Sequence, residues 1–111
     1  MAYDEDLANR VREILAGDPG YAERKMFGGL CFTINGNMAC GIVGGELMLR
    51  LTRELADAAL TRPHVRPMDF TGRPIASMVY VAPAGLKGRG LRSWVEKAAT
   101  HARSLPPKTS R

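Results

Sequence analysis

Three glycine-containing dipeptides divide the first half of the chain at short, regular intervals. Gly28-Gly29, Asn35-Gly36 and Gly44-Gly45 separate short runs that are rich in apolar residues. Dipeptides of this kind supply the positive φ angles of the two-residue turns that join antiparallel strands. The spacing therefore predicts a β-meander with strands near residues 22–27, 30–34, 37–43 and 46–51.

The same glycines do not match a nucleotide-binding loop. Neither G-x-G-x-x-G nor G-x-x-x-x-G-K-[ST] occurs in the sequence, and a phosphate-binding loop requires a helix directly after its glycines. We expect no nucleotide and no other cofactor.

An amphipathic helix is predicted before the meander, over residues 4–16. Asp4 is a candidate N-cap, and apolar residues then recur at helical spacing. Gly17 suits the left-handed position after a helix, and Pro19 prevents continuation.

A short helix is predicted directly after the meander. Thr52 is its candidate N-cap and Pro63 follows its end. Helical spacing predicts four inward-facing residues: Leu55, Ala58, Ala59 and Leu60.

The remaining chain predicts two more strands and a last helix. Prolines mark residues 67–74 as a turn-rich approach or an edge strand, and residues 75–81 are rich in strand-forming residues. From about residue 86 or 88 to Arg103 the pattern is that of an amphipathic helix with a basic outer side.

This order of elements predicts an α+β fold. A chain of 111 residues with 45% hydrophobic residues is long enough for one modest core. We expect a single domain over residues 1–105 and a disordered tail over residues 106–111. The acidic start and the absence of a long apolar run predict a cytoplasmic protein that does not span a membrane.

An uninterrupted hairpin at Asn35-Gly36 places Cys31 opposite Cys40. Such a pair lies at the short limit of disulfide geometry. Two interpretations remain open, a redox pair and two reduced thiols that pack as small hydrophobic residues.

The same register assigns the strand residues to two faces. The core face is predicted to carry Cys31, Met38, Cys40, Ile42, Leu47, Leu49 and Leu51. The opposite face is both apolar and charged, which predicts a self-association or partner-binding surface. Its residues are Lys25, Phe27, Leu30, Phe32, Ile34, Val43, Met48 and Arg50.

Positive charge is concentrated at the C-terminal end. Residues 86–111 contain seven basic residues and one acidic residue. Basic side chains near a helix start favour anions, so this helix is a candidate nucleic-acid or anion site. Its candidate residues are Lys87, Arg89, Arg92, Lys97 and Arg103; the alternative is a solvated basic surface.

Candidate catalytic and metal-binding residues are few. His64 and Asp69 form a dyad only if their loop folds back, and the set Cys31, Cys40, His64 and His101 lacks the close spacing of zinc ligands. We expect no enzymatic activity, no catalytic residues and no metal.

Two motifs carry a resemblance to a known family. "KMFGG" at residues 25–29 and "MDFTGRP" at residues 68–74, followed by a helix that contains Trp94, resemble the N-terminal domain of the TfoX/Sxy family of bacterial proteins. The resemblance spans about Leu7 to Leu105. It implies an α+β domain with a mainly antiparallel sheet packed by helices, similar to YjbR-like folds.

The resemblance also implies regulation without catalysis. TfoX/Sxy proteins regulate natural competence and act with the cAMP receptor protein, and the family has no established catalytic residues. The full regulators carry a second, helical domain that this sequence lacks, so we expect a stand-alone N-terminal domain. The matching motif residues have architectural roles in turns and packing.

Three hypotheses follow from the sequence. The first is a non-enzymatic regulatory domain that binds a protein partner or forms a homodimer. The second is direct nucleic-acid binding through the basic last helix. The third is a small-ligand domain or an unrecognised enzyme near His64 and Asp69.

Overall fold

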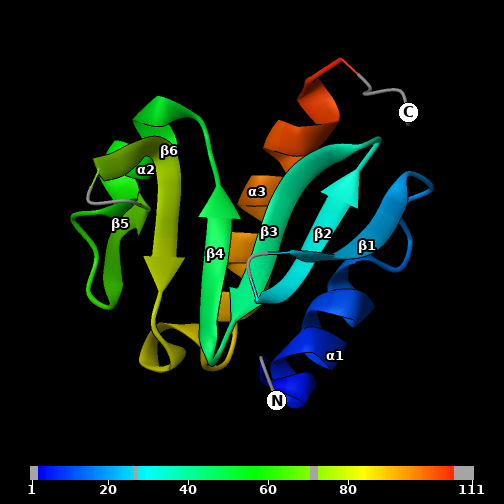
Figure 1. The fold of residues 1–111 in the computed structure, drawn as a ribbon, viewed down its shortest axis with the longest axis horizontal. Coiled ribbons are helices and arrows are strands. Elements are labelled where there is room, and N and C mark those ends of the chain that lie inside the picture. Colours follow the sequence, from blue (N-terminus) through cyan, green and yellow to red (C-terminus); the bar gives the residue numbers. More distant parts are fainter. Residues whose placement is uncertain (1–2, 27, 71–72, 107–111) are drawn as a thin grey trace.

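The computed structural model describes residues 3–26, 28–70 and 73–106. These residues form three α-helices, a short 3₁₀-helix and six strands (Figure 1). In chain order they are α1 (Glu5–Leu15), β1 (Tyr21–Met26), β2 (Gly29–Ile34), β3 (Asn37–Val43), β4 (Glu46–Arg50), α2 (Arg53–Ala59), β5 (Val65–Phe70), β6 (Arg73–Val81), η1 (Pro83–Leu86) and α3 (Gly90–Ser104).

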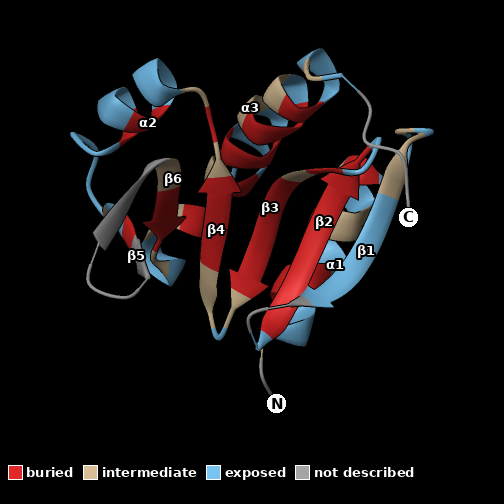
Figure 2. Cartoon of the chain, turned by 45° about the horizontal axis from the view of Figure 1, so that its top comes forward, coloured by how far each residue is buried: buried red, intermediate tan, exposed pale blue. Residues whose placement is uncertain are grey.

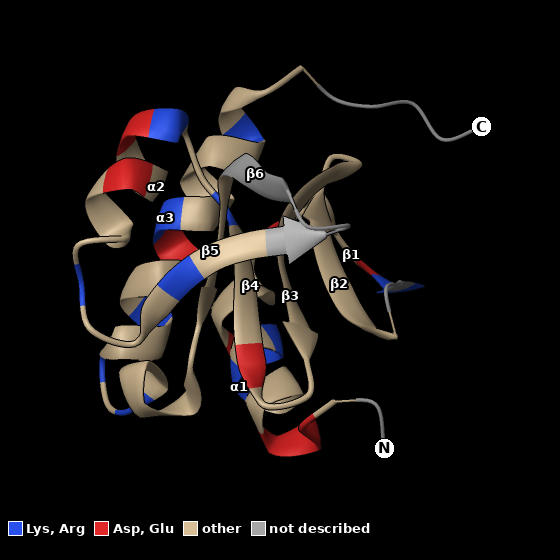
Figure 3. Cartoon of the chain, turned by 60° about the vertical axis from the view of Figure 1, so that its left-hand side comes forward, with Lys and Arg blue, Asp and Glu red and all other residues tan. Residues whose placement is uncertain are grey.

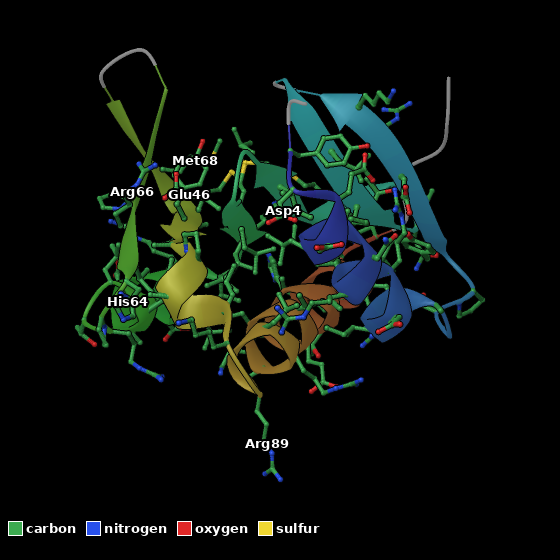
Figure 4. All side chains as sticks on the ribbon, turned by 90° about the horizontal axis from the view of Figure 1, so that it is seen from below. Asp4, Glu46, His64, Arg66, Met68 and Arg89 are labelled. Atoms are coloured by element: carbon green, nitrogen blue, oxygen red, sulfur yellow. The ribbon has the colours of Figure 1, made fainter. Side chains whose placement is uncertain are left out.

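The six strands form one antiparallel sheet in the order β1-β2-β3-β4-β6-β5. Helix α3 packs across β2, β3 and β4, α1 packs beside α3, and α2 packs on β6. Seen from below, the helices lie on one side of a curved sheet, and the β1–β2 and β5–β6 pairs rise on the other (Figure 4). The predicted α+β fold is confirmed.

Local sequence signals set most element boundaries. The Leu7 amide donates to Asp4 Oδ1 over 3.1 Å, and the Leu55 amide donates to Thr52 Oγ1 over 3.0 Å, so both predicted N-caps are confirmed. Asn35 and Gly36 have φ angles of 54° and 82°, as a two-residue hairpin turn of this kind requires. The left-handed geometry predicted for Gly17 is wrong, because its φ is not positive.

The predicted register between β2 and β3 is wrong beyond the first two pairs. Thr33 pairs with Met38, but Phe32 pairs with Cys40, so Ala39 is an extra residue on β3. Such a β-bulge shifts every later pair by one position. Relative to the side chains of the other strand, those of one strand then point to the opposite face of the sheet from the one that an uninterrupted register predicts. Cys31 therefore pairs with Gly41, and the two cysteines do not face each other.

The bulge also changes which residues form the main core. Leu30, Phe32 and Ile34 were expected on the mixed face, but they are 4%, 0% and 0% exposed within the core beneath the helices. Ala39 and Cys40 both join this core, as the bulge requires. Figure 2 shows the resulting band of buried residues through the central strands and the inner side of α3.

The second face of the sheet carries a smaller apolar cluster, formed by Cys31, Met48, Met68 and Tyr80, which we call the second-face cluster. Cys31, Gly41, Met48 and Tyr80 follow one another across four neighbouring strands. Met38, Val43 and Met78 pack around the cluster and are half-buried. Val43 and Met48 thus lie on the face that was predicted to bind a partner, as expected. Cys31 and Met38 lie on the same face, although they were expected in the main core.

Three other residues of the expected partner face have separate environments. Lys25 is exposed on β1, and Arg50 is half-buried at the end of β4. Phe27 lies outside the described residues, as do residues 107–111 of the predicted tail.

Both cysteines are buried free thiols. Burial raises the pKa of the Cys31 thiol and that of the Cys40 thiol above their ordinary value. Because the thiolate is the reactive form, a raised pKa lowers the fraction of each thiol that can react at neutral pH. The geometry favours structural cysteines over the redox pair.

Candidate functional site

A groove of about 770 Å³ lies between α2 and α3. Figure 3 shows the two helices side by side, with Lys and Arg on both. The groove is lined by Leu55, Arg89, Arg92, Ser93, Glu96, Lys97 and Thr100. Three of the five predicted basic site residues are therefore brought together here.

Helical spacing on α3 places the charged lining residues on one outer side. Arg92 pairs with Glu96 over 3.4 Å, and Lys97 Nζ donates to Ser93 Oγ over 2.9 Å. Both Arg92 and Glu96 are more than half exposed, so this pair is weak and leaves the arginine available to a ligand. Arg89 extends outward from the start of α3 (Figure 4).

Trp94 is a core residue whose ring contacts two cations, one of which lines the groove. The residue is only 7% exposed, yet Lys97 Nζ lies 5.2 Å from its ring centroid and the Arg62 guanidinium lies 5.6 Å from it. These cation–π contacts hold Lys97 and the turn that follows α2 against one aromatic ring. Arg62 was not among the predicted site residues, because only the tertiary fold brings it to α3.

The orientation of α2 gives the groove an apolar wall. Leu55 was expected to point inward, but it is 38% exposed, as is Leu60. Ala56 and Ala59, three residues apart, are each 3% exposed and form the buried side of α2 instead. Their small side chains let α2 pack closely on β6, and Leu55 is left at the groove.

The two other predicted basic residues do not line the groove. Arg103 Nε bonds to Asp18 Oδ2 over 2.6 Å, which fastens the end of α3 to the loop after α1. Lys87 is exposed in the connection from η1 to α3, and its carbonyl accepts the Gly90 amide over 3.1 Å. Arg103 therefore has a structural partner where a nucleic-acid contact was expected.

The Asp18–Arg103 pair makes stability depend on pH. Hydrogen bonding from Arg103 lowers the pKa of Asp18, whose side chain is only 8% exposed. Because this pKa is lower in the folded state, the pair stabilises the fold at pH values above the unfolded-state pKa, and this stability is lost as the pH falls through the folded-state pKa.

We expect Asp18→Asn to lower the free energy of unfolding by about 1 kcal/mol near neutral pH and by less near pH 3. Urea unfolding at both pH values measures this, with exposed Asp57→Asn as the matched control. Equal losses at both pH values would contradict it.

The histidine-based site hypotheses gain no support from the geometry. His64 precedes β5 and Asp69 lies near its far end, so their Cα atoms are about 17 Å apart along an extended strand. The described ranges contain no cluster of three or more His, Cys, Asp or Glu residues that could hold a metal ion.

Among the described helices, none is long and apolar enough to cross a membrane.

Searches of curated proteins and of solved structures gave no match. A family model described as the TfoX N-terminal domain matches residues 13–102, from within α1 to near the end of α3. This match includes the whole sheet, both "KMFGG" and "MDFTGRP", and nearly all of the groove-forming helices. The chain therefore belongs to the TfoX N-terminal domain family.

Proposed function

We propose that this chain is a non-enzymatic regulatory domain that binds an acidic, partly apolar segment of a protein partner in the α2–α3 groove. The observation that supports this proposal is the presence of Arg89, Arg92 and Lys97 beside an exposed leucine in one groove. Cations attract carboxylates, and Leu55 offers the apolar contact that an amphipathic segment needs. The TfoX family supports a regulatory role.

A protein segment fits the groove better than a nucleic-acid backbone does. Leu55 offers a contact to an apolar side chain of a protein segment and contributes nothing to phosphate binding. Direct nucleic-acid binding remains the second candidate, because the same three cations would contact phosphates.

The second sheet face is a weaker candidate for self-association. Cys31, Met48 and Met68 are each 1% exposed within a single chain, so most of this apolar cluster is already buried. The described residues that add accessible apolar surface around it, Met38, Val43 and Met78, are themselves half-buried. We therefore place the partner in the groove.

Fluorescence anisotropy tests the proposal with two labelled probes. One is a peptide with glutamate and leucine at helical spacing, and the other is a short DNA duplex. We expect saturable peptide binding that weakens about tenfold in Arg92→Gln/Lys97→Gln, because two exposed charge contacts are lost. Leu55→Ala should weaken it further.

The matched control is Arg24→Gln/Lys25→Gln, which removes the same charge from exposed positions on β1. This variant should bind the peptide as the parent does. Duplex binding that falls steeply with salt and is indifferent to Leu55→Ala would instead support the nucleic-acid candidate. Binding of neither probe would contradict both.

A further inference from the structure

A second pocket, of about 490 Å³, lies where β4 passes into α2. Three segments that are distant in sequence form it: residues 50–53, residues 77–78 of β6, and His101 of α3. It is lined by Arg50, Leu51, Thr52, Arg53, Ser77, Met78 and His101, and it shares no residue with the α2–α3 groove.

The lining residues suit a small anion. Two arginines, a histidine and two hydroxyl residues are present, and none of the seven is acidic. Neither Arg50 nor Arg53 has a carboxylate partner within 4 Å in the part of the chain that the structure describes. Guanidinium groups match the geometry of phosphate oxygens, and the volume lies in the usual range for small-molecule sites.

The backbone at Ser77 is a separate indication of a ligand site. Its φ is 76°, in the left-handed region where glycine is the favoured residue. The Leu51 amide donates to the Ser77 carbonyl over 2.7 Å, and Met78 pairs with Arg50, so the sheet holds this geometry in place. Strained residues of this kind cluster at ligand-binding sites. Ser77 is also one of the residues that line the pocket.

We propose that this pocket binds a small molecule that carries a phosphate group. Arg53 and His101 hold the phosphate oxygens together with the Ser77 hydroxyl, and Arg50 adds positive charge from the end of β4. Thr52 Oγ1 already accepts the Leu55 amide, so its hydroxyl proton remains to be donated.

The test uses inorganic phosphate, adenosine 5′-monophosphate and adenosine at constant ionic strength. We expect saturable shifts of the Thr52, Ser77, Met78 and His101 amide signals in two-dimensional NMR with the two phosphate probes. Adenosine alone should give no shift. Arg53→Gln should weaken binding about tenfold, as the loss of one charge-assisted contact predicts.

Ser77→Gly separates a binding role from a structural one. Glycine adopts the observed φ without strain, so the variant should melt at the same or a higher temperature and yet bind the phosphate probes more weakly. The matched control is Arg24→Gln, which removes one charge from an exposed position on β1 and should leave binding unchanged. Equal binding by adenosine, unchanged binding in both Arg53→Gln and Ser77→Gly, or no saturable shift would overturn the proposal.

Discussion

Replacing Phe32 with alanine should destabilise the domain by about 3–5 kcal/mol, the usual loss for a fully buried aromatic side chain. Phe32 is 0% exposed in the core beneath the helices, and its ring stacks on Tyr21 at a centroid distance of 6.2 Å. An uninterrupted β2–β3 register would place the same ring on the mixed face, where truncation costs much less. Urea unfolding followed by circular dichroism therefore tests the bulge as well as the core.

Leu55→Ala is the matched control for this measurement. It removes apolar side-chain atoms at a position that is 38% exposed, so we expect a change within about 0.5 kcal/mol. If Phe32→Ala does not fold, Phe32→Leu should still show a loss of about 1–2 kcal/mol. Similar small losses in the Phe32 and Leu55 variants would mean that Phe32 is not in the main core.

The β-meander could be predicted from the sequence because its signals are local. Asn35-Gly36 supplies both positive φ angles of its own turn, and Asp4 and Thr52 cap helices that begin at the next residue. Each of these features depends on a few neighbouring residues, so no knowledge of the tertiary fold is needed.

The bulge at Ala39 could not be predicted in this way. An extra residue in β3 is favoured only once Leu30, Phe32 and Ile34 can be buried beneath α3, and that helix lies far along the chain. Alternation alone gives the uninterrupted register, which placed these three residues on the wrong face.

Only the positive charge of the candidate site could be predicted from the sequence. The basic side of α3 follows from helical spacing, but the partners of its residues are distant in sequence. Arg103 meets Asp18 from 85 positions away, and Leu55 becomes exposed because Ala56 and Ala59 fit against β6. Which cations remain available to a ligand is thus a property of the tertiary fold.

The two adjacent glycines of the "KMFGG" motif have different physical roles. Gly28 has a φ of 74° and open space around it, so it serves the turn before β2. A Cβ atom on Gly29 would lie 2.0 Å from the Ile42 carbonyl oxygen and 3.2 Å from Val43 Cγ2. Backbone atoms cannot move aside as a flexible side chain can, so Gly29 is required for the close approach of β2 and β3.

Gly29→Ala should therefore cost about 3 kcal/mol or more, at the upper end of the usual range for overpacking. Gly17→Ala is the matched control, because nothing lies within 4 Å of its added Cβ and its φ is not positive. The control should keep or gain up to about 1 kcal/mol, since alanine restricts the unfolded chain. The denaturant midpoints of the two variants and the parent measure both stability changes. Equal stability of Gly29→Ala and Gly17→Ala would show that β2 and β3 do not approach this closely, and the motif would then need another explanation than strand packing.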